Sequence, residues 1–201
     1  MPGSTHDRRS FPAVQLPAQD GGSPTEVTLI AQLGIGAGDA LVSDAGQRQR
    51  HHPAFIDALD EPSARLGGMH LQHGDASSLY SFTVGAGGHP FHRHAGPRMF
   101  TAIAGSAGAE LRFATASDTQ LAADPGAFAR TLRRIRIPPD CLFTVRFGGG
   151  TWHQFASNHP AHPALFALSC HSNELAGAMS ELARAQVQRN AADIPSLTEV
   201  L

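Results

Sequence analysis

Three histidines carry the strongest chemical signal in this chain of 201 residues. His92 and His94 lie one residue apart in an extended segment, and alternation along a strand puts both imidazoles on the same face. His153 follows a run of glycines and can bring a third imidazole to the same point. Three neutral imidazoles can hold one divalent metal ion and leave positions open for water, dioxygen or a substrate. The sequence therefore predicts a three-histidine metal site.

Short apolar segments, separated by glycine and proline, surround these histidines. The segments that predict strands are 26–33, 79–84, 92–94, 98–103, 132–137, 142–147, 152–155 and 165–170. We expect 92–94 to form a hairpin with 98–103 across a turn that contains proline. We expect the same of 132–137 and 142–147. Many short strands at this spacing are typical of a β-sandwich or barrel.

With these elements the chain resembles the cupin superfamily, whose small jelly-roll barrel holds a metal ion inside. His92, His94 and Gly105 match the first cupin motif, and Gly150 and His153 match the second. The resemblance implies an all-β fold, a cupin jelly-roll β-barrel, with the three histidines as metal ligands. It does not imply one reaction, because this superfamily hosts many chemistries.

The chain departs from the cupin motifs at the metal site. Arg98 stands where the family has a metal-binding glutamate, and Ser157 stands at the usual asparagine position. Without the glutamate, the site is similar to those of cupin thiol and diketone dioxygenases, which use Fe(II). Imidazole ligands also suit Zn or Ni, whereas the missing carboxylate argues against Mn. The alternative is a decayed cupin whose histidines only pack or form hydrogen bonds.

The functional prediction is therefore a metal-dependent cupin, with an Fe(II) dioxygenase as the first choice. Its substrate is a small organic molecule, anionic if Arg98 binds it. A rival prediction is a redox-neutral isomerase or lyase that uses the metal as a Lewis acid. Another is a ligand-binding or sensory cupin that never turns over. The identity of the bound metal discriminates among these three readings.

Arg98 and Tyr80 are the candidate catalytic residues. A guanidinium matches a carboxylate through two parallel hydrogen bonds, so Arg98 could orient an acidic substrate beside the metal. The alternative is a surface arginine paired with Glu110 or an aspartate. Tyr80, the only tyrosine, could donate a proton or hydrogen bond in the cavity, or belong to the core. His89 could be a fourth ligand or an exposed loop residue, and His171 could reach the barrel mouth or serve the structure.

The rest of the chain indicates one domain with appendages. Residues 1–24 are polar and rich in Pro, Gly and Ser, which predicts a flexible tail. Residues 25–171 are expected to form the barrel, with the motifs between about positions 76 and 170. Residues 172–201 are expected to form a C-terminal helical segment, with a helix from about Ser172 to Arg189. Two further segments predict a short helix at 53–59 and a rim loop or lid at 116–128.

The composition excludes several function classes. The net charge is −2, which leaves no electrostatic basis for binding nucleic acid or a membrane surface. All 15 basic residues are arginines, so a lysine Schiff base is excluded. No apolar stretch is long enough to span a membrane, and the N-terminus lacks the apolar core of a signal peptide. We expect a cytoplasmic protein with a small-molecule substrate, assembled as a homodimer.

Overall fold

Thirteen strands form the framework of the computed structural model, which describes residues 11–18, 23–124 and 126–201. The larger sheet contains β1 (Ala13–Leu16), β2 (Thr25–Gln32), β3 (Phe55–Ile56), β4 (Ser63–Gly67), β5 (Ser78–Val84), β7 (Arg98–Ala104), β10 (Cys141–Phe147) and β12 (Leu165–His171). The smaller sheet contains β6 (His92–His94), β8 (Ala109–Ala114), β9 (Leu132–Ile137), β11 (Trp152–Ser157) and β13 (Thr198–Val200). The helices are α1 (Ala37–Arg50), α2 (Asp118–Ala123), α3 (Ala127–Thr131) and α4 (Glu181–Gln188).

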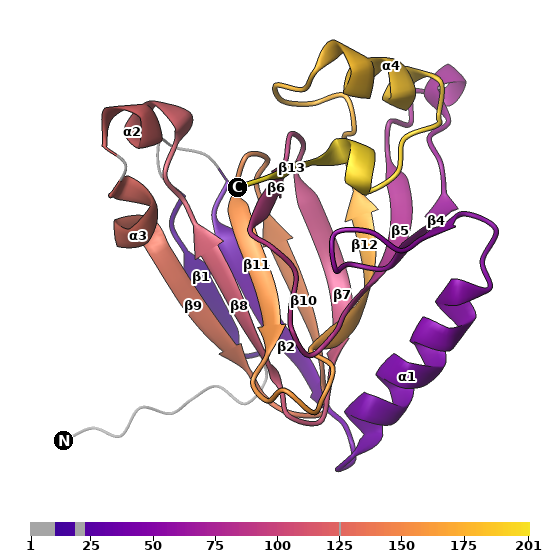
Figure 1. The fold of residues 1–201 in the computed structure, drawn as a ribbon, viewed down its shortest axis with the longest axis vertical. Helices are drawn as coiled ribbons and strands as arrows, with labels where there is room; N and C mark the ends of the chain where they lie inside the picture. The colour runs from indigo at the N-terminus through magenta and orange to yellow at the C-terminus, as the bar shows by residue number, and fades with distance from the viewer. Residues whose placement is uncertain (1–10, 19–22, 125) are drawn as a thin grey trace.

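The two antiparallel sheets face each other and enclose the core, as Figure 1 shows. The strand order is β1-β2-β10-β7-β12-β5-β4-β3 in the larger sheet and β13-β6-β11-β8-β9 in the smaller one. Alternation along each strand sends one set of side chains into the space between the sheets. This is the all-β cupin jelly roll that the motifs predict.

The eight predicted strands lie where the sequence places them, but five further strands were not predicted and the predicted hairpins are wrong. β6 pairs with β11 and β13, whereas β7 pairs with β10 and β12 in the other sheet. β9 pairs with β8, and β10 pairs with β2 and β7. At both predicted hairpins the chain therefore crosses from one sheet to the other. A proline or glycine turn predicts where a strand ends, but not whether the chain returns beside it.

Several appendages differ from the sequence predictions. β1 lies inside the segment expected to be a tail and pairs with β2, while residues 1–10 and 19–22 lie outside the described residues. The expected helix at 53–59 is wrong, because that segment contains the short strand β3. The expected rim loop at 116–128 contains α2 and the start of α3.

The C-terminal helix starts later than the sequence predicts. Ser180 caps α4, because its hydroxyl accepts a hydrogen bond from the Ala183 amide at 3.1 Å. Ala183 and Val187 are the buried residues of this helix, whereas Leu182 is exposed. After α4 the chain returns to the smaller sheet as β13, which pairs with β6. The C-terminal segment thus reaches the strand that carries two of the candidate ligands.

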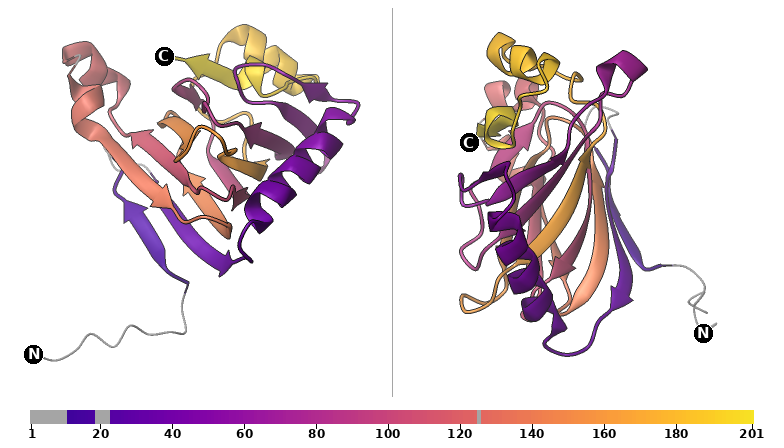
Figure 2. Two further views of the ribbon diagram at one scale, coloured as in Figure 1. Left: turned by 60° about the horizontal axis from the view of Figure 1, so that its bottom comes forward. Right: turned by 90° about the vertical axis from the view of Figure 1, so that its right-hand side faces the viewer.

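Helix α1, which the sequence analysis does not predict, lies along the outer face of the larger sheet (Figure 2). Its Gln49 side chain donates to the Ser81 hydroxyl at 3.0 Å and accepts from the Thr83 hydroxyl at 2.9 Å. Gln49 is buried, so these bonds satisfy polar groups that would otherwise lose their water. Among the described residues, none of the helices combines the length and apolarity needed to cross a bilayer.

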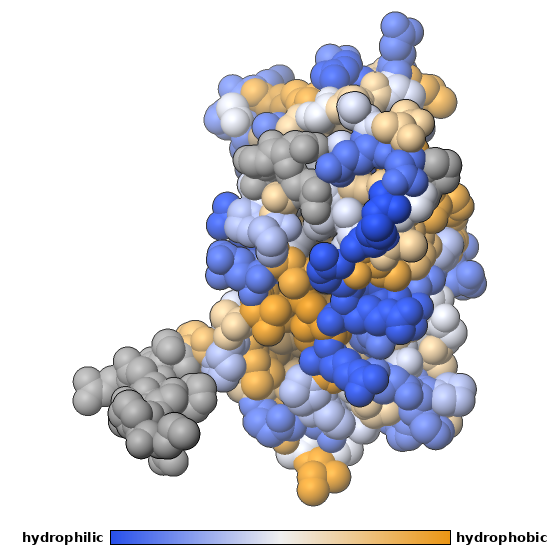
Figure 3. Space-filling view, turned by 90° about the vertical axis from the view of Figure 1, so that its left-hand side faces the viewer, coloured by the Kyte–Doolittle hydropathy of each residue, from blue (hydrophilic) through white to orange (hydrophobic). Residues whose placement is uncertain are grey.

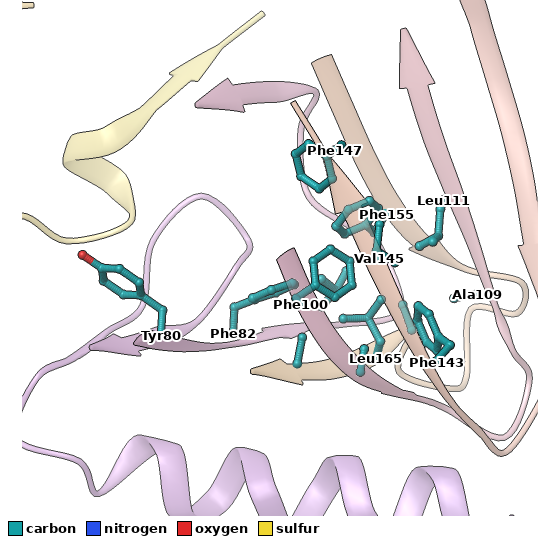
Figure 4. Packing of buried hydrophobic residues seen from close by; sticks show 14 of the residues in the cluster. Tyr80, Phe82, Phe100, Ala109, Leu111, Phe143, Val145, Phe147, Phe155 and Leu165 are labelled. Carbon is teal, nitrogen blue, oxygen red and sulfur yellow. The ribbon is translucent and has the colours of Figure 1, made fainter. Parts of the chain in front are cut away.

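The core between the sheets is largely aromatic, as Figure 4 shows. Phe100 makes edge contacts with Phe82 and Phe143, at ring-centroid distances of 5.3 and 6.4 Å. On the side where the edge strands β1 and β9 lie, the two sheets leave an apolar groove of about 140 Å³. Figure 3 views this side and shows apolar surface flanked by hydrophilic side chains. The core is therefore packed at its centre and open to solvent along one seam.

Candidate metal centre

The three predicted histidines converge inside the barrel. β6 and β11 pair so that His92 stands opposite His153, and alternation along β6 puts His94 on the same face. The ring centroids lie 4.3 Å apart for His92 and His153, and 5.0 Å apart for His92 and His94. One nitrogen of each ring lies within 4.8 Å of one nitrogen of each of the others. The spacing suits a single shared metal ion.

Hydrogen bonds to the backbone orient two of these rings. Nδ1 of His153 lies 2.9 Å from the Thr151 carbonyl, and Nδ1 of His94 lies 3.2 Å from the Leu197 carbonyl. A carbonyl only accepts, so each Nδ1 carries the proton and each Nε2 carries a free lone pair. Backbone carbonyls that hold the outer nitrogen in this way are the usual support of a metal-binding histidine.

His92 is the least satisfied of the three. Its side chain is fully buried, and neither ring nitrogen has a hydrogen-bond partner among the described residues. Buried polar atoms in folded proteins almost always have hydrogen-bond partners. The ring nitrogens of His92 therefore need a partner that the described residues do not provide. A metal ion would complete one of its nitrogens. The donor set therefore fits a divalent cation.

Burial also keeps the three rings in the form that binds metal. Removal from water is the main cause that lowers the pKa of His92, His94 and His153 below the ordinary range of histidine. The rings lower one another further, because two imidazolium charges would repel at this distance. All three are neutral at pH 7, and only a neutral imidazole can coordinate a cation.

The structure explains why glycine occupies two of the motif positions. Gly150 has a φ of +74° and donates its amide hydrogen to the His94 carbonyl at 2.8 Å. A Cβ at Gly105 would lie 2.0 Å from the Pro163 carbonyl oxygen, so no larger residue fits there. The motif therefore marks turns that place the ligand strands, in addition to the ligands themselves.

Glu61 is a site residue that the sequence analysis missed. It precedes β4 and its side chain is buried, with Oε2 3.5 Å from Nε2 of His92. That oxygen has no hydrogen-bond partner among the described residues. Burial raises the pKa of the Glu61 carboxyl to about 8, against the opposing effect of the Arg98 charge. No motif surrounds Glu61, so only the fold reveals that it points at the histidines.

His89 is buried, which corrects the expectation of an exposed loop residue. Its Nδ1 donates to the Pro90 carbonyl at 2.8 Å, and its Nε2 accepts from the Phe155 amide at 3.1 Å. Burial lowers the pKa of His89 to about 4, so the ring is neutral at pH 7. Both nitrogens are engaged, and His89 supports the site through packing and hydrogen bonds.

Arg98 lies inside the barrel, where it meets a carboxylate. Its Nη2 lies 3.8 Å from Oε2 of Glu174, and its Nη1 donates to the Gly96 carbonyl at 3.2 Å. Its Nε is buried without a partner among the described residues. The alternative of a surface arginine paired with Glu110 is therefore wrong, because Glu110 pairs with Arg112 instead. Burial lowers the pKa of Arg98 to about 10, which leaves it charged at pH 7.

His171 and Tyr80 pack together beside Arg98. Nδ1 of His171 lies 2.7 Å from Oε1 of Glu174, and the rings of Tyr80 and His171 lie 4.4 Å apart. The Tyr80 hydroxyl points toward the C-terminal segment (Figure 4) and donates to the Ala192 carbonyl at 3.3 Å. Tyr80 therefore packs in the core, as the alternative predicts, and its position does not support a proton donor in the cavity.

Two cavities meet at His94 and Arg98. The outer pocket, of about 680 Å³, lies between β6, the loop before α4 and the C-terminal segment, and it is also lined by Glu174. The inner cavity is about 10 Å³, which is the size that one water molecule needs, and His153 and Glu61 face it. A small molecule in the outer pocket would therefore lie beside His94 and the buried guanidinium of Arg98.

Comparisons with known proteins give a remote likeness. No protein-family model matches the chain, and no curated protein matches it. Among solved structures, a protein from Shewanella oneidensis is 13% identical, with 79% of this chain and 98% of that chain covered and a TM-score of 0.45. Ectoine synthase from P. lautus is 12% identical, with 77% and 86% covered and a TM-score of 0.41.

The oxalate decarboxylase of Lactobacillus farciminis is 10% identical, with 67% of this chain and 35% of that chain covered and a TM-score of 0.43. The chain thus spans about a third of the length of that enzyme, and 33% of the length of CapF. These values carry no conclusion about activity. The two antiparallel sheets of this chain, with the motif histidines on β6 and β11, form the all-β fold that the cupin motifs predict.

Proposed function

We propose that this protein is a metal-dependent enzyme, and that it is an Fe(II) dioxygenase for a small organic anion. The observation that supports a metal most directly is the convergence of three buried, neutral imidazoles with free donor nitrogens. His92, His94 and His153 would hold the ion. Bound iron would supply the redox chemistry that activates dioxygen at the positions these three ligands leave open.

Arg98 supports an anionic substrate. It is a buried cation whose Nε has no hydrogen-bond partner in the part of the chain that the structure describes, and it lines both the outer pocket and the inner cavity. Its pairing with Glu174 is loose at 3.8 Å, so a carboxylate in the pocket can compete for the guanidinium. Arg98 would bind and orient the acid group, and the packed aromatic rings behind it exclude bulk water from the inner cavity.

Oxygen consumption tests this proposal. The protein is loaded with Fe(II) without air, then mixed with air-saturated buffer and a panel of small thiols, diketones, and hydroxy and keto acids. We expect at least one compound to accelerate dioxygen uptake, followed with an electrode, and His153→Ala to abolish that acceleration. No uptake across the panel, with Zn or Ni in the purified protein, would support the isomerase or lyase reading instead.

We also propose that the chain forms a homodimer. Leu79, Met99 and Leu168 lie on neighbouring strands of the larger sheet, and their side chains are 42%, 49% and 46% exposed. Leu79 and Met99 flank Cys170 across the sheet, so these side chains form one apolar area. Light scattering at micromolar concentrations should give twice the chain mass. Leu168→Glu should shift the mass toward that of a single chain, and a monomeric wild type would contradict the proposal.

A further inference from the structure

We propose that Glu61 is a fourth protein donor of the metal centre. This inference rests on the proposed metal-dependent function and adds a residue to it. The sequence motifs place no carboxylate at the site, since position 98 is an arginine. The fold brings one there from another part of the chain, from the segment that enters β4.

The first observation is that unpartnered atoms face each other. Oε2 of Glu61 lies 3.5 Å from Nε2 of His92, and neither atom has a hydrogen bond among the described residues. Glu61 is 5% exposed and His92 is not exposed at all, so water does not solvate either group from outside. A buried carboxyl oxygen beside a buried imidazole nitrogen is completed either by a proton or by a cation between or beside the two atoms. A divalent ion bound to the histidines would take the place of that proton.

The second observation is the backbone that delivers Glu61. Leu59 and Asp60, immediately before it, have φ values of 58° and 54°. Residues with a Cβ rarely adopt this left-handed conformation, and for a side chain as large as leucine it costs free energy. Such strain persists where the surrounding structure imposes it, and it clusters at functional sites. Here the strained pair turns the chain so that Glu61 points into the barrel.

The third observation is that the other buried carboxylates are occupied. Glu174 accepts from His171 at 2.7 Å and faces Arg98. Asp140 accepts from the Gly38 amide at 2.7 Å and from the Ser106 hydroxyl at 2.6 Å. His89, the other nearby ligand type, uses both of its nitrogens within the protein. Among the buried acidic side chains that the structure describes, Glu61 alone has a side-chain oxygen without any such role.

The inner cavity connects Glu61 with the remaining ligands. The cavity of about 10 Å³ is lined by Glu61 together with His94 and His153. The carboxylate oxygen lies within 4.8 Å of a donor nitrogen on His92 and of one on His89, and His92 also belongs to the group of three converging histidines. A carboxylate donor changes metal preference, because oxygen ligands suit Mn²⁺, which three imidazoles alone do not favour.

Metal titration of the apo-protein tests the inference. Mn²⁺ and Zn²⁺ are titrated calorimetrically into wild type, Glu61→Gln and the control Glu110→Gln, which removes a carboxylate on β8 that pairs with Arg112. We expect Glu61→Gln to weaken Mn²⁺ binding at least about 10-fold. Loss of a residue that only supports a metal ligand through a hydrogen bond already weakens metal binding by about 10- to 100-fold, so loss of a ligand should cost no less. Zn²⁺ binding should weaken less, and Glu110→Gln should match wild type.

Thermal melting separates a ligand from a structural residue. Without metal, Glu61→Gln should melt at or above the wild-type temperature, because the variant no longer buries an acid without a partner. With Mn²⁺ it should melt below wild type. A loss of melting temperature that is equal with and without metal would indicate a structural role and overturn the inference.

The outcomes also separate this inference from the proposed function. If wild type binds neither metal, the metal-dependent function fails and Glu61 has no ion to bind. If wild type and Glu61→Gln bind Mn²⁺ equally, the function stands and the inference fails. Should Glu61→Gln not fold, infrared difference spectra of wild type with one equivalent of Mn²⁺ decide the matter. New carboxylate bands are expected, and no change in the carboxylate region would overturn the inference.

Discussion

Glu61 and Glu174 are both buried carboxyls inside the barrel, yet their surroundings differ. Burial raises the pKa of both, to about 8 for Glu61 and to about 7 for Glu174. Glu174 contacts His171 and Arg98, so the protein itself completes its environment. Glu61 lies against the ring of His92, and its Oε2 has no hydrogen-bond partner among the described residues. The difference favours a structural role for the Glu174 cluster and motivates the metal-binding role that we propose for Glu61.

The contrast between Glu61 and Glu174 is wrong if the histidines beside Glu61 bind no metal. Wild type should hold about one divalent ion per chain, with nitrogen ligands at roughly 2.0–2.2 Å. His153→Ala should lose most of this metal and keep its fold, because the core around the ring is aromatic. Elemental analysis and circular dichroism check the two halves of this prediction. Equal metal in wild type and in the triple His→Ala variant of positions 92, 94 and 153 would refute the metal centre.

On the partnered side, removal of Glu174 should cost stability and spare the metal. Glu174→Ala leaves the Arg98 charge buried without its carboxylate, which should lower the free energy of unfolding by about 3 kcal/mol. Urea denaturation of the metal-free protein measures this change. The control Glu110→Ala breaks a more accessible ion pair and should cost less than about 1 kcal/mol. Equal effects of the two variants would show that the Glu174 cluster is not structural.

The raised pKa of Glu174 predicts a pH dependence. Because the folded state holds this proton more tightly than the unfolded chain, the stability it contributes is complete below the ordinary pKa of 4.5. This contribution falls as the pH rises toward about 7. The loss should amount to about 3 kcal/mol at most. Urea midpoints measured between these pH values for wild type and Glu174→Gln check the prediction. The fall in urea midpoint with rising pH that is due to Glu174 should be absent in Glu174→Gln. Parallel curves of urea midpoint against pH for the two proteins would contradict the prediction.

Arg98 lies between the metal centre and Glu174. Its replacement should weaken substrate binding more than metal binding. Arg98→Ala should weaken binding of the active acid by about 10- to 100-fold, the range expected for hydrogen bonds to a charged group. Metal content should stay at the wild-type level. Arg98→Lys should rescue poorly, because an ammonium lacks the planar fork. Titration of the acid that stimulates oxygen uptake measures the effect, and full activity of Arg98→Lys would remove the case for paired hydrogen bonds.

Local patterns were sufficient for eight of the strands and for the triad. Alternation places His92 and His94 on one face of any strand, whatever surrounds it, and the glycines near His153 require a turn wherever the chain goes. The same locality explains the errors. A turn containing proline does not specify which sheet the next strand joins. Ser172 and Ser180 are both suitable helix caps by residue type, and the contacts of α4 decide that Ser180 caps the helix. Pairing depends on residues far apart in the sequence.

The two acidic partners in the barrel could not be predicted in this way. Glu61 and Glu174 lie in segments without a motif, and a glutamate in a connecting segment is ordinarily exposed. Only the packed barrel brings Glu61 to His92 and Glu174 to Arg98, across 31 and 76 positions of the chain. The shared face of His92 and His94 could be predicted from the sequence, because the spacing of ligands along one strand is local. Whether a buried acid finds a partner is decided by tertiary packing, because burial and hydrogen bonding depend on every element that closes around it.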